Sequence, residues 1–395
     1  MGSHLADVGG QNLHHMLTHS PWEYKGLFDA IFSRCLNLLK GQRDRIYLII
    51  DEVGFRKKGR HSACVGNQYL GCIGKNDNGQ VAVVAALNAG DLYCPVDIEL
   101  FMPKEWDNDL ERRQKAGLPE GKKHESKTVM AVSMIKRLFK KLGSRFECVV
   151  FDALYTSNPD LLYELMNKNI SFIGDVKENI QVFLKEPDWV VPEYTGRGRR
   201  PFKAKPNPLP IKVRDYMKSL GADDFEKLQV RNGTKGVIRA RYHRRKVWLL
   251  HEPSNTLMPL QLLIRQNEDG TAKYALGYST WKATTMRMAQ AQAQRTFVER
   301  IFEEGKNIAG MADYQTRSWT GFHRHVALVS LALLFLMEQK IVLKESIGKV
   351  TAYQIQFLVN AMTKTLSSID HVIANLTEKI PKYQNQIRYQ LKTVT

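Results

Sequence analysis

Two runs of apolar residues, each ending in an aspartate, constrain the fold of this chain more than any other feature. RIYLIID covers residues 45–51 and FECVVFD covers residues 146–152. A continuous apolar run of this length is typical of a strand that is buried on both faces, as in sheets covered by helices. Helical patterns accompany both runs, so the sequence predicts an α/β fold with a mixed sheet.

Turn and helix signals place the elements around these two strands. We expect helix over residues 12–40 with a break at Pro21, and a helix over 127–143. Asn158 followed by Pro159 predicts the start of a short helix, and residues 170–176 predict a third buried strand. Residues 62–89 predict a hairpin that turns at KNDNG (75–79), and residues 91–121 predict a long polar loop.

Residues 195–250 differ in composition from the rest of the chain. They hold sixteen Lys and Arg residues against four acids, which is +12 of the whole chain's +18. Short alternating runs in this region predict strands, so we expect a basic, β-rich insertion that interrupts the α/β core. A purely solvated surface rarely concentrates this much charge, so contact with a polyanion such as nucleic acid is favoured.

Other features limit the cellular setting. The longest apolar run, residues 326–337, is shorter than the roughly 20 residues that a membrane span needs, and predicts a buried helix. The N-terminus has no signal-peptide pattern, and the five cysteines form no Cys-x-x-Cys pair. We therefore expect a cytoplasmic protein without membrane attachment.

Three acids are candidates for a metal site. Asp51 and Asp152 end neighbouring strands, where side chains from adjacent strand ends share one crevice. Glu299 shares a helix face with Arg295 and Lys306, a pattern that also suits a surface ion-pair ladder. Three carboxylates form a minimal ligand set for two Mg²⁺ ions in phosphoryl transfer.

Two further acids lie close by in the sequence. Glu303 shares the helix face of Glu299 but breaks the spacing with Arg295 and Lys306, so it ranks second. Glu52 follows Asp51 directly and is expected to point to the opposite face of the strand, away from a metal.

At three places the sequence resembles bacterial insertion-sequence DDE transposases. IIDEVGFRKKGRHSACVGNQYLGCIGKNDNGQV resembles the first-aspartate block, VVFDALY the second block, and RTFVERIFEEGKNIAGMADYQTRSWTGFHRHVALVSLALLF the third block. Arg295, Glu299 and Lys306 match the spacing of the Tyr-Arg-Glu-Lys motif that marks a subgroup with a β-rich insertion. Gln292 stands at the tyrosine position, a departure that removes any DNA contact made by that ring.

The resemblance implies an RNase H-like catalytic domain with a mixed sheet, interrupted by a β-rich insertion, with helical N- and C-terminal segments. We expect a helical segment 1–44, catalytic core in 45–178 and 283–340, an insertion domain 179–282, and a helical segment 341–395. The resemblance also implies cut-and-paste transposition, in which Asp51, Asp152 and Glu299 hold two Mg²⁺ ions, for which Mn²⁺ can substitute. The implied partners are double-stranded DNA at transposon ends and target, and a second copy of the chain in a homodimer.

Candidate DNA contacts come from the resemblance and from clustered charge. Arg295 and Lys306 would contact phosphates beside the scissile bond. The basic cluster after Asp51 and the basic insertion are further candidates, and Trp248 could stack on an extruded base, although packing in the core is the commoner role for such a residue. The candidates are Arg56, Lys57, Lys58, Arg60, Arg197, Arg199, Arg200, Arg241, Arg244, Arg245, Lys246 and Trp248.

Two alternative functions remain open at the level of sequence. The chain could be a host-adopted DNA-binding regulatory protein that no longer cuts, although such proteins commonly lose one of the three acids. It could also be a structure-selective nuclease of the same fold that performs no strand transfer.

Overall fold

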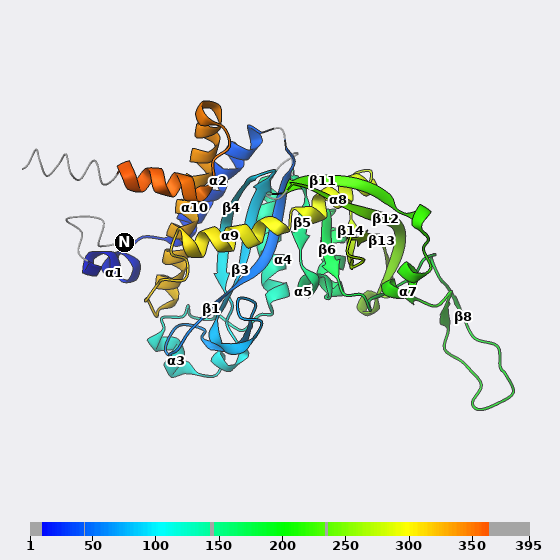
Figure 1. Cartoon of the computed structure of the whole chain (residues 1–395). Helices are drawn as coiled ribbons and strands as arrows, with labels where there is room; N and C mark the ends of the chain where they lie inside the picture. Colours follow the sequence, from blue (N-terminus) through cyan, green and yellow to red (C-terminus); the bar gives the residue numbers. More distant parts are fainter. Residues whose placement is uncertain (1–9, 43, 143–145, 234–235, 363–395) are drawn as a thin grey trace, which may run out of the picture.

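One large mixed sheet with helices packed against it forms the body of the molecule (Figure 1). The computed structural model describes residues 10–42, 44–142, 146–233 and 236–362. The first part of the chain forms α1 (Gly10–Thr18), α2 (Tyr24–Lys40), β1 (Ile46–Arg56), β2 (Gly66–Leu70), β3 (Lys75–Ala89), β4 (Leu92–Leu100), η1 (Lys104–Trp106), α3 (Leu110–Lys115), α4 (Lys127–Leu142), β5 (Phe146–Phe151), α5 (Ala153–Thr156), α6 (Pro159–Asn167) and β6 (Phe172–Val176).

The second part begins with short strands and then extends the sheet. Its elements are β7 (Gln181–Val182), β8 (Asp188–Val190), β9 (Lys205–Asn207), β10 (Ile211–Lys212), α7 (Val213–Lys218), η2 (Ala222–Asp224), β11 (Glu226–Gly233), β12 (Gly236–His251), η3 (Glu252–Ser254), β13 (Thr256–Gln266), β14 (Ala272–Tyr278), α8 (Thr285–Ala293), α9 (Thr296–Asn307) and α10 (Trp319–Ile347). Residues 352–362 are helical as well.

The strand order explains why the two apolar runs are buried. The main path runs β11-β12-β13-β14-β6-β5-β1-β3-β2. β4 pairs with residues 82–89 of β3, beyond the part of β3 that pairs with β2. β1 is antiparallel to β3 but parallel to β5, and β5 is parallel to β6. β1 and β5 are therefore central strands, and Leu48 and Val149 have no exposed surface. The prediction of an α/β fold with a large mixed sheet is confirmed.

Helices cover the sheet where the apolar side chains lie. α8 and α9 cross one face in Figure 1, and α4 lies behind the strands on the other side. α2 and α10 pack on β4. By length and composition α10 could cross a membrane, but here it packs on β4 and α2 and buries Phe322, Val326 and Leu333.

Local signals fixed several boundaries as expected. Pro21 falls in the break between α1 and α2. The Asn158 side chain accepts hydrogen bonds from the backbone N–H groups of Asp160 and Leu161, and Pro159 is the first residue of α6. An oxygen acceptor at the N-cap satisfies donors that the first helical turn leaves free, which is why this pair predicted the helix start. The predicted stop at Gly143 and the helix expected beyond residue 362 lie outside the described residues.

Two predictions in the β-rich first part were wrong. KNDNG is not a turn: it lies inside β3, where Leu70 pairs with Lys75 and Gly66 with Gly79, so the turn spans residues 71–74. Gly74 supplies the left-handed conformation that this tight turn needs, with φ of 66°. The expected loop 91–121 contains β4, in which residues 93–96 are all buried and the buried Ile98 and Leu100 alternate with the partly exposed Asp97 and Glu99.

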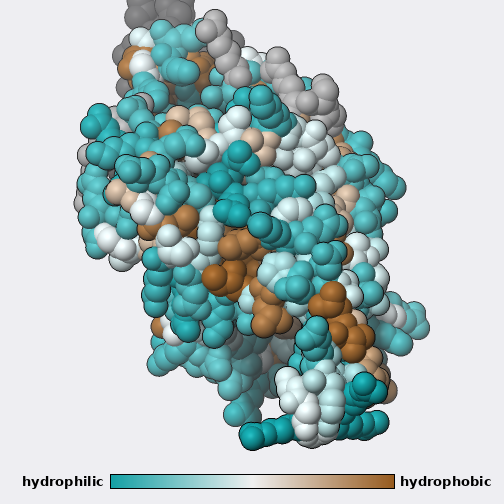
Figure 2. Space-filling view, turned by 90° about the vertical axis from the view of Figure 1, so that its right-hand side faces the viewer, coloured by the Kyte–Doolittle hydropathy of each residue, from teal (hydrophilic) through white to brown (hydrophobic). Residues whose placement is uncertain are grey.

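The basic region continues the main sheet: β12 pairs with β13, β13 with β14, and β14 with β6, all in antiparallel orientation. β8 and β9 form a separate two-stranded hairpin that we call the arm (residues 188–207). The arm projects from the end of the molecule in Figure 1. Figure 2 views that end, where hydrophobic side chains interrupt a mostly hydrophilic surface. The domain boundaries expected from sequence stay predictions.

Candidate active site

The candidate site lies where two parallel strands separate. The last parallel pair of β1 and β5 joins Ile50 to Phe151, and the next residues are Asp51 and Asp152. β5 stops here, and Asp152 begins α5 by accepting a hydrogen bond from the backbone N–H of Leu154 at 2.9 Å. β1 instead continues along β3 as far as Arg56, so Asp51 lies within its strand and the prediction that it ends the strand was wrong. The carboxylates of Asp51 and Asp152 nevertheless lie close together, at the point where β5 ends beside β1.

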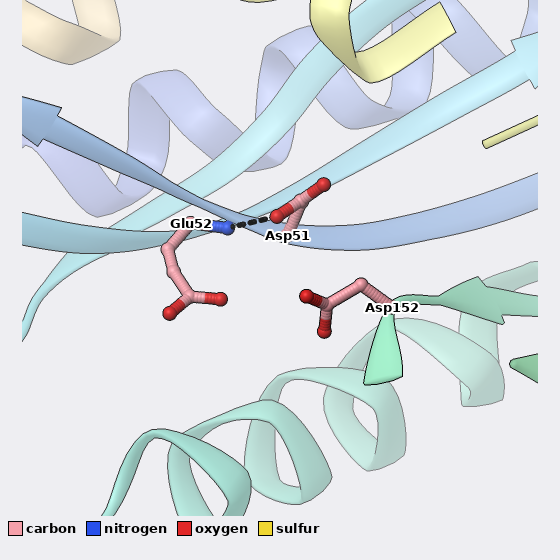
Figure 3. A group of neighbouring side chains, drawn as sticks. All are labelled: Asp51, Glu52 and Asp152. Carbon is pink, nitrogen blue, oxygen red and sulfur yellow. Dashed lines mark hydrogen bonds between the residues drawn. The ribbon is translucent and has the colours of Figure 1, made fainter. Parts of the chain in front are cut away.

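Three carboxylates converge at this edge. One oxygen each of Asp51, Glu52 and Asp152 lies within 4.8 Å of the other two, and all three residues are partly buried (Figure 3). Carboxylates at this separation repel one another unless a proton or a cation lies between them. Oxygen donors of this kind are the ligands preferred by Mg²⁺ and Ca²⁺, so this set fits a hard divalent cation.

Glu52 was expected to point to the opposite face of β1 from Asp51, and its side chain does leave the strand on the other side (Figure 3). The expectation that this would keep it away from a metal was wrong, because its carboxylate belongs to the cluster. Beyond Ile50 the strand has no β5 neighbour, and the Glu52 side chain is long enough to reach across this open edge toward Asp152 (Figure 3). Lys127 on α4 holds it there, with 2.8 Å between Lys127 Nζ and Glu52 Oε1.

Burial dominates the electrostatics of Asp51. It raises the pKa of Asp51 from its ordinary value of 3.8 to about 7, an effect that Arg295 opposes and Asp152 reinforces. Burial also raises the pKa of Tyr155, which lies near all three acids, well above its usual range. A carboxyl with a pKa near neutrality can lose its proton when a cation binds.

Arg295, the residue that precedes α9, links the cluster to a fourth acid. One terminal nitrogen of its guanidinium lies 3.7 Å from Asp51 Oδ2, and the other lies 3.8 Å from Asp175 Oδ2 on β6. Gln292 on α8 donates a hydrogen bond from Nε2 to Asp175 Oδ1 at 2.8 Å. The structure thus brings the predicted residue Arg295 to the predicted residue Asp51.

The remaining residues of the third motif lie along α9. Lys306 reaches β1, where its Nζ donates to the carbonyl oxygen of Gly54 at 3.4 Å. Glu299 and Glu303 are exposed, and the three-acid group found in the described part of the chain contains neither. The role of Glu299 therefore stays a prediction.

The basic residues that follow Asp51 differ in their contacts. Arg56 is paired with Asp77 at 2.9 Å. The Lys57 ammonium lies 3.5 Å from the centre of the Tyr314 ring, and burial lowers its pKa to about 8. Lys58 and Arg60 are exposed and line an open cleft together with acids and amides of β2, β3, η1 and α3.

In the basic region, the strand residues are tied to their neighbours. Arg241 donates to the carbonyl of Ala222 at 2.6 Å. Arg244 donates to Gln261 at 2.5 Å and Arg245 to the Tyr216 hydroxyl at 3.3 Å. Trp248 is partly buried next to Phe183, with the exposed Lys246 ammonium 4.8 Å from its ring centre.

The arm residues are different. Arg197, Arg199 and Arg200 are exposed, and within the described part of the chain none has an acidic partner within ion-pair distance. Arg199 and Arg200 lie instead 5.2 and 5.9 Å from the rings of Phe202 and Tyr194. These cations therefore keep their full capacity for an external anion.

Asp175 is the site residue that sequence reasoning missed. It interrupts the apolar run of the predicted strand 170–176, and an acid within a buried strand was the one signal that pointed to it. Its significance depends on the β6–β5 pairing and on the placement of Arg295, neither of which is encoded locally.

The geometry defines a class: a mixed α/β protein whose parallel strand ends gather carboxylates suited to a divalent cation. A family model described as "DDE superfamily endonuclease" matches residues 1–237, more than half of the chain. The chain belongs to this family.

Individual proteins resemble the chain over very different shares of their own length, and the chain covers less than half of the curated transposase that it matches. A probable transposase for insertion sequence element IS701 from Microchaete diplosiphon is 35% identical over 170 residues, which cover 43% of this chain and 41% of that protein. Among solved structures, a piggyBac transposase synaptic complex with hairpin DNA has a TM-score of 0.39 and 11% identity over 80% of this chain and 52% of that chain. The NurA nuclease from Sulfolobus solfataricus has a TM-score of 0.26 and 8% identity over 86% of this chain and 99% of that chain.

Proposed function

We propose that this protein is a DNA transposase: a metal-dependent nuclease and strand transferase that cuts at the ends of an insertion sequence and joins them to target DNA. One observation carries the proposal. The carboxylates of Asp51 and Asp152, about a hundred residues apart in the chain, converge at the point where β5 ends beside β1. Family membership supports the same reading.

The catalytic core would be RNase H-like. Three antiparallel strands (β4, β3, β1) continue into two parallel strands (β5, β6), and the first central strand carries the first acid. Residues 179–282 would be an insertion in that core. In this assignment the acids of the first two motifs lie on the adjacent strands β1 and β5, at the point where β5 ends.

Asp51 and Asp152 would hold the divalent cations, with Glu299 as the predicted third ligand and Glu52 as an additional candidate. Mg²⁺, or Mn²⁺ in its place, supplies charge neutralisation at the scissile phosphate and lowers the pKa of the attacking water. Arg295 and Lys306 would hold phosphate oxygens beside the cluster. The exposed arm cations would contact the double-stranded DNA backbone farther away, and a homodimer would hold two DNA ends.

The test is cleavage of DNA that carries the flanking repeats of the element's own locus, with the cut strands and joined products mapped. The wild-type protein should cut and join only with Mg²⁺ or Mn²⁺. Asp51→Asn and Asp152→Asn should each lower the cleavage rate at least about a hundredfold, since even outer-shell changes cost tenfold or more in metal sites. Glu345→Gln, at an exposed acid on α10, is the control. Cleavage without a divalent cation would overturn the proposal.

A further inference from the structure

Gln292, Asp175 and Arg295 form a connected set beside the acid cluster. The Gln292 amide donates to one oxygen of Asp175, and the other oxygen faces the Arg295 guanidinium. The guanidinium in turn lies between Asp175 on β6 and Asp51 on β1, 3.8 and 3.7 Å from them. Asp175 therefore shares this arginine with a predicted metal ligand.

The Arg295 guanidinium does not make all the hydrogen bonds that it could donate. Both carboxylates are farther away than the roughly 2.7–2.9 Å typical of a direct charge-assisted hydrogen bond. Arg295 Nε is buried and has no hydrogen-bond partner among the described residues. A buried donor without a partner is costly, and a phosphate oxygen at this point would satisfy it.

The competition between the two acids has a direct consequence for cation binding. If Asp175 were absent, Asp51 would be the one acid of this pair left to the guanidinium, and the two would move into direct contact. A cation would then have to displace Arg295 from Asp51 before it could bind. Asp175 draws the positive charge toward β6 and keeps Asp51 available.

We propose that Asp175 is a positioning residue, oriented by Gln292, that holds Arg295 at the rim of the acid cluster. There the guanidinium leaves Asp51 to the cation, and its exposed part can face a DNA phosphate. The proposal rests on the proposed function, because it assumes that the cluster binds a divalent cation. It also gives a role to Gln292, which occupies the tyrosine position of the motif and is used in this chain for an internal hydrogen bond.

The experiment measures binding of Mn²⁺ to the full-length protein by calorimetry, without DNA and without turnover. Asp175→Ala should weaken Mn²⁺ binding about tenfold, in the range found for residues that orient metal ligands. The same substitution in an Arg295→Ala background should have almost no effect, because the competing cation is gone. A role confined to structural support predicts the same loss in both backgrounds.

A second variant guards against loss of folding. Gln292→Ala should weaken Mn²⁺ binding in the same Arg295-dependent way but less strongly, and Gln290→Ala on the same helix is its matched control. Circular dichroism verifies that each variant is folded. Asp175→Glu should restore part of the wild-type affinity, because it keeps the charge.

The outcomes separate two failures. If the wild-type protein does not bind Mn²⁺, the proposed function fails. If the wild-type protein binds Mn²⁺ but Asp175→Ala leaves the affinity unchanged, or weakens it equally with and without Arg295, the proposed function stands and the positioning role is overturned.

Discussion

Asp51 and Asp152 each follow directly on the last parallel residue pair of β1 and β5, and this shared register brings their carboxylates to within 4.8 Å. Because both acids depend on one pairing, neither can shift without the other. The cluster is therefore a property of the sheet and does not depend on a mobile loop.

Cation binding should depend on pH because burial raises the pKa of Asp51 to about 7. A cation must displace this proton, so the affinity for Mn²⁺ should rise steeply between about pH 6 and pH 8 and then level off. Calorimetric titration at each pH measures it. An affinity that stays flat across this range would contradict the assigned pKa.

The raised pKa of Asp51 also determines whether the stability of the folded protein rises or falls with pH. Between the ordinary pKa of 3.8 and about 7, the folded protein keeps a proton that the unfolded chain releases. The stability of the metal-free protein should therefore decline as pH rises through this window. In EDTA, the unfolding temperature of Asp51→Asn minus that of the wild type should increase between about pH 4 and pH 8, because the variant lacks the titrating carboxyl. A difference that stays constant with pH would refute the effect.

The third ligand can be assigned by comparing two glutamates. Glu52 lies in the cluster, whereas Glu299 is exposed on α9 and matches the family motif. If Glu299 ligates a cation only after DNA binds, Glu299→Gln should abolish cleavage but leave Mn²⁺ binding to the free protein nearly unchanged. Glu52→Gln should instead weaken Mn²⁺ binding to the free protein and affect cleavage less than Glu299→Gln does. Full cleavage by Glu299→Gln would remove it from the site.

The arm should add to DNA affinity through charge alone. Replacing Arg197, Arg199 and Arg200 together by Gln should reduce the slope of log affinity against log salt by up to about 2.7, because each phosphate that an arginine neutralises adds about 0.9 to this slope. Fluorescence anisotropy at several salt concentrations measures the change.

Three exposed lysines distant in sequence from the arm, Lys25, Lys140 and Lys344, provide the control when changed together to Gln. An equal change in slope for both triple variants would show that the arm has no special contact with DNA.

Gly174 on β6 should tolerate no side chain. A Cβ there would collide with Thr156 Oγ1 and the Phe151 ring, both of which border Asp152. Gly174→Ala should cost about 1–3 kcal/mol in the free energy of unfolding and slow cleavage. Denaturant unfolding measures the first effect. Gly26→Ala on α2, where space is open, should be neutral or slightly stabilising.

The sequence predicted the central sheet well because its signals are local and strong. The apolar runs of β1 and β5 can be satisfied only in a covered sheet, and the Asn158–Pro159 pair specifies a helix start by its own hydrogen bonds. The turn was wrongly predicted at KNDNG because residues of these types also occur at an exposed strand end. The actual turn at residues 71–74 has weaker turn signals in its sequence.

The site was predictable in part. Asp51, Asp152 and Arg295 were found from strand ends and motif spacing, and the structure brings them together. Glu52 and Asp175 were not, because their placement depends on where β5 stops and on which strand lies beside it. Such relations arise between segments far apart in the chain and leave no local periodicity.

The pairings of β12 with β13, β13 with β14 and β14 with β6 make the basic region part of the same sheet as the acid cluster. Excising the strands from β11 to β14 would not leave the rest of that sheet intact. It would leave β6, the strand that bears Asp175, with a bare edge of backbone donors and acceptors open to association with other chains. Any shortened descendant of this protein would have to supply a replacement edge strand before it could dispense with the region.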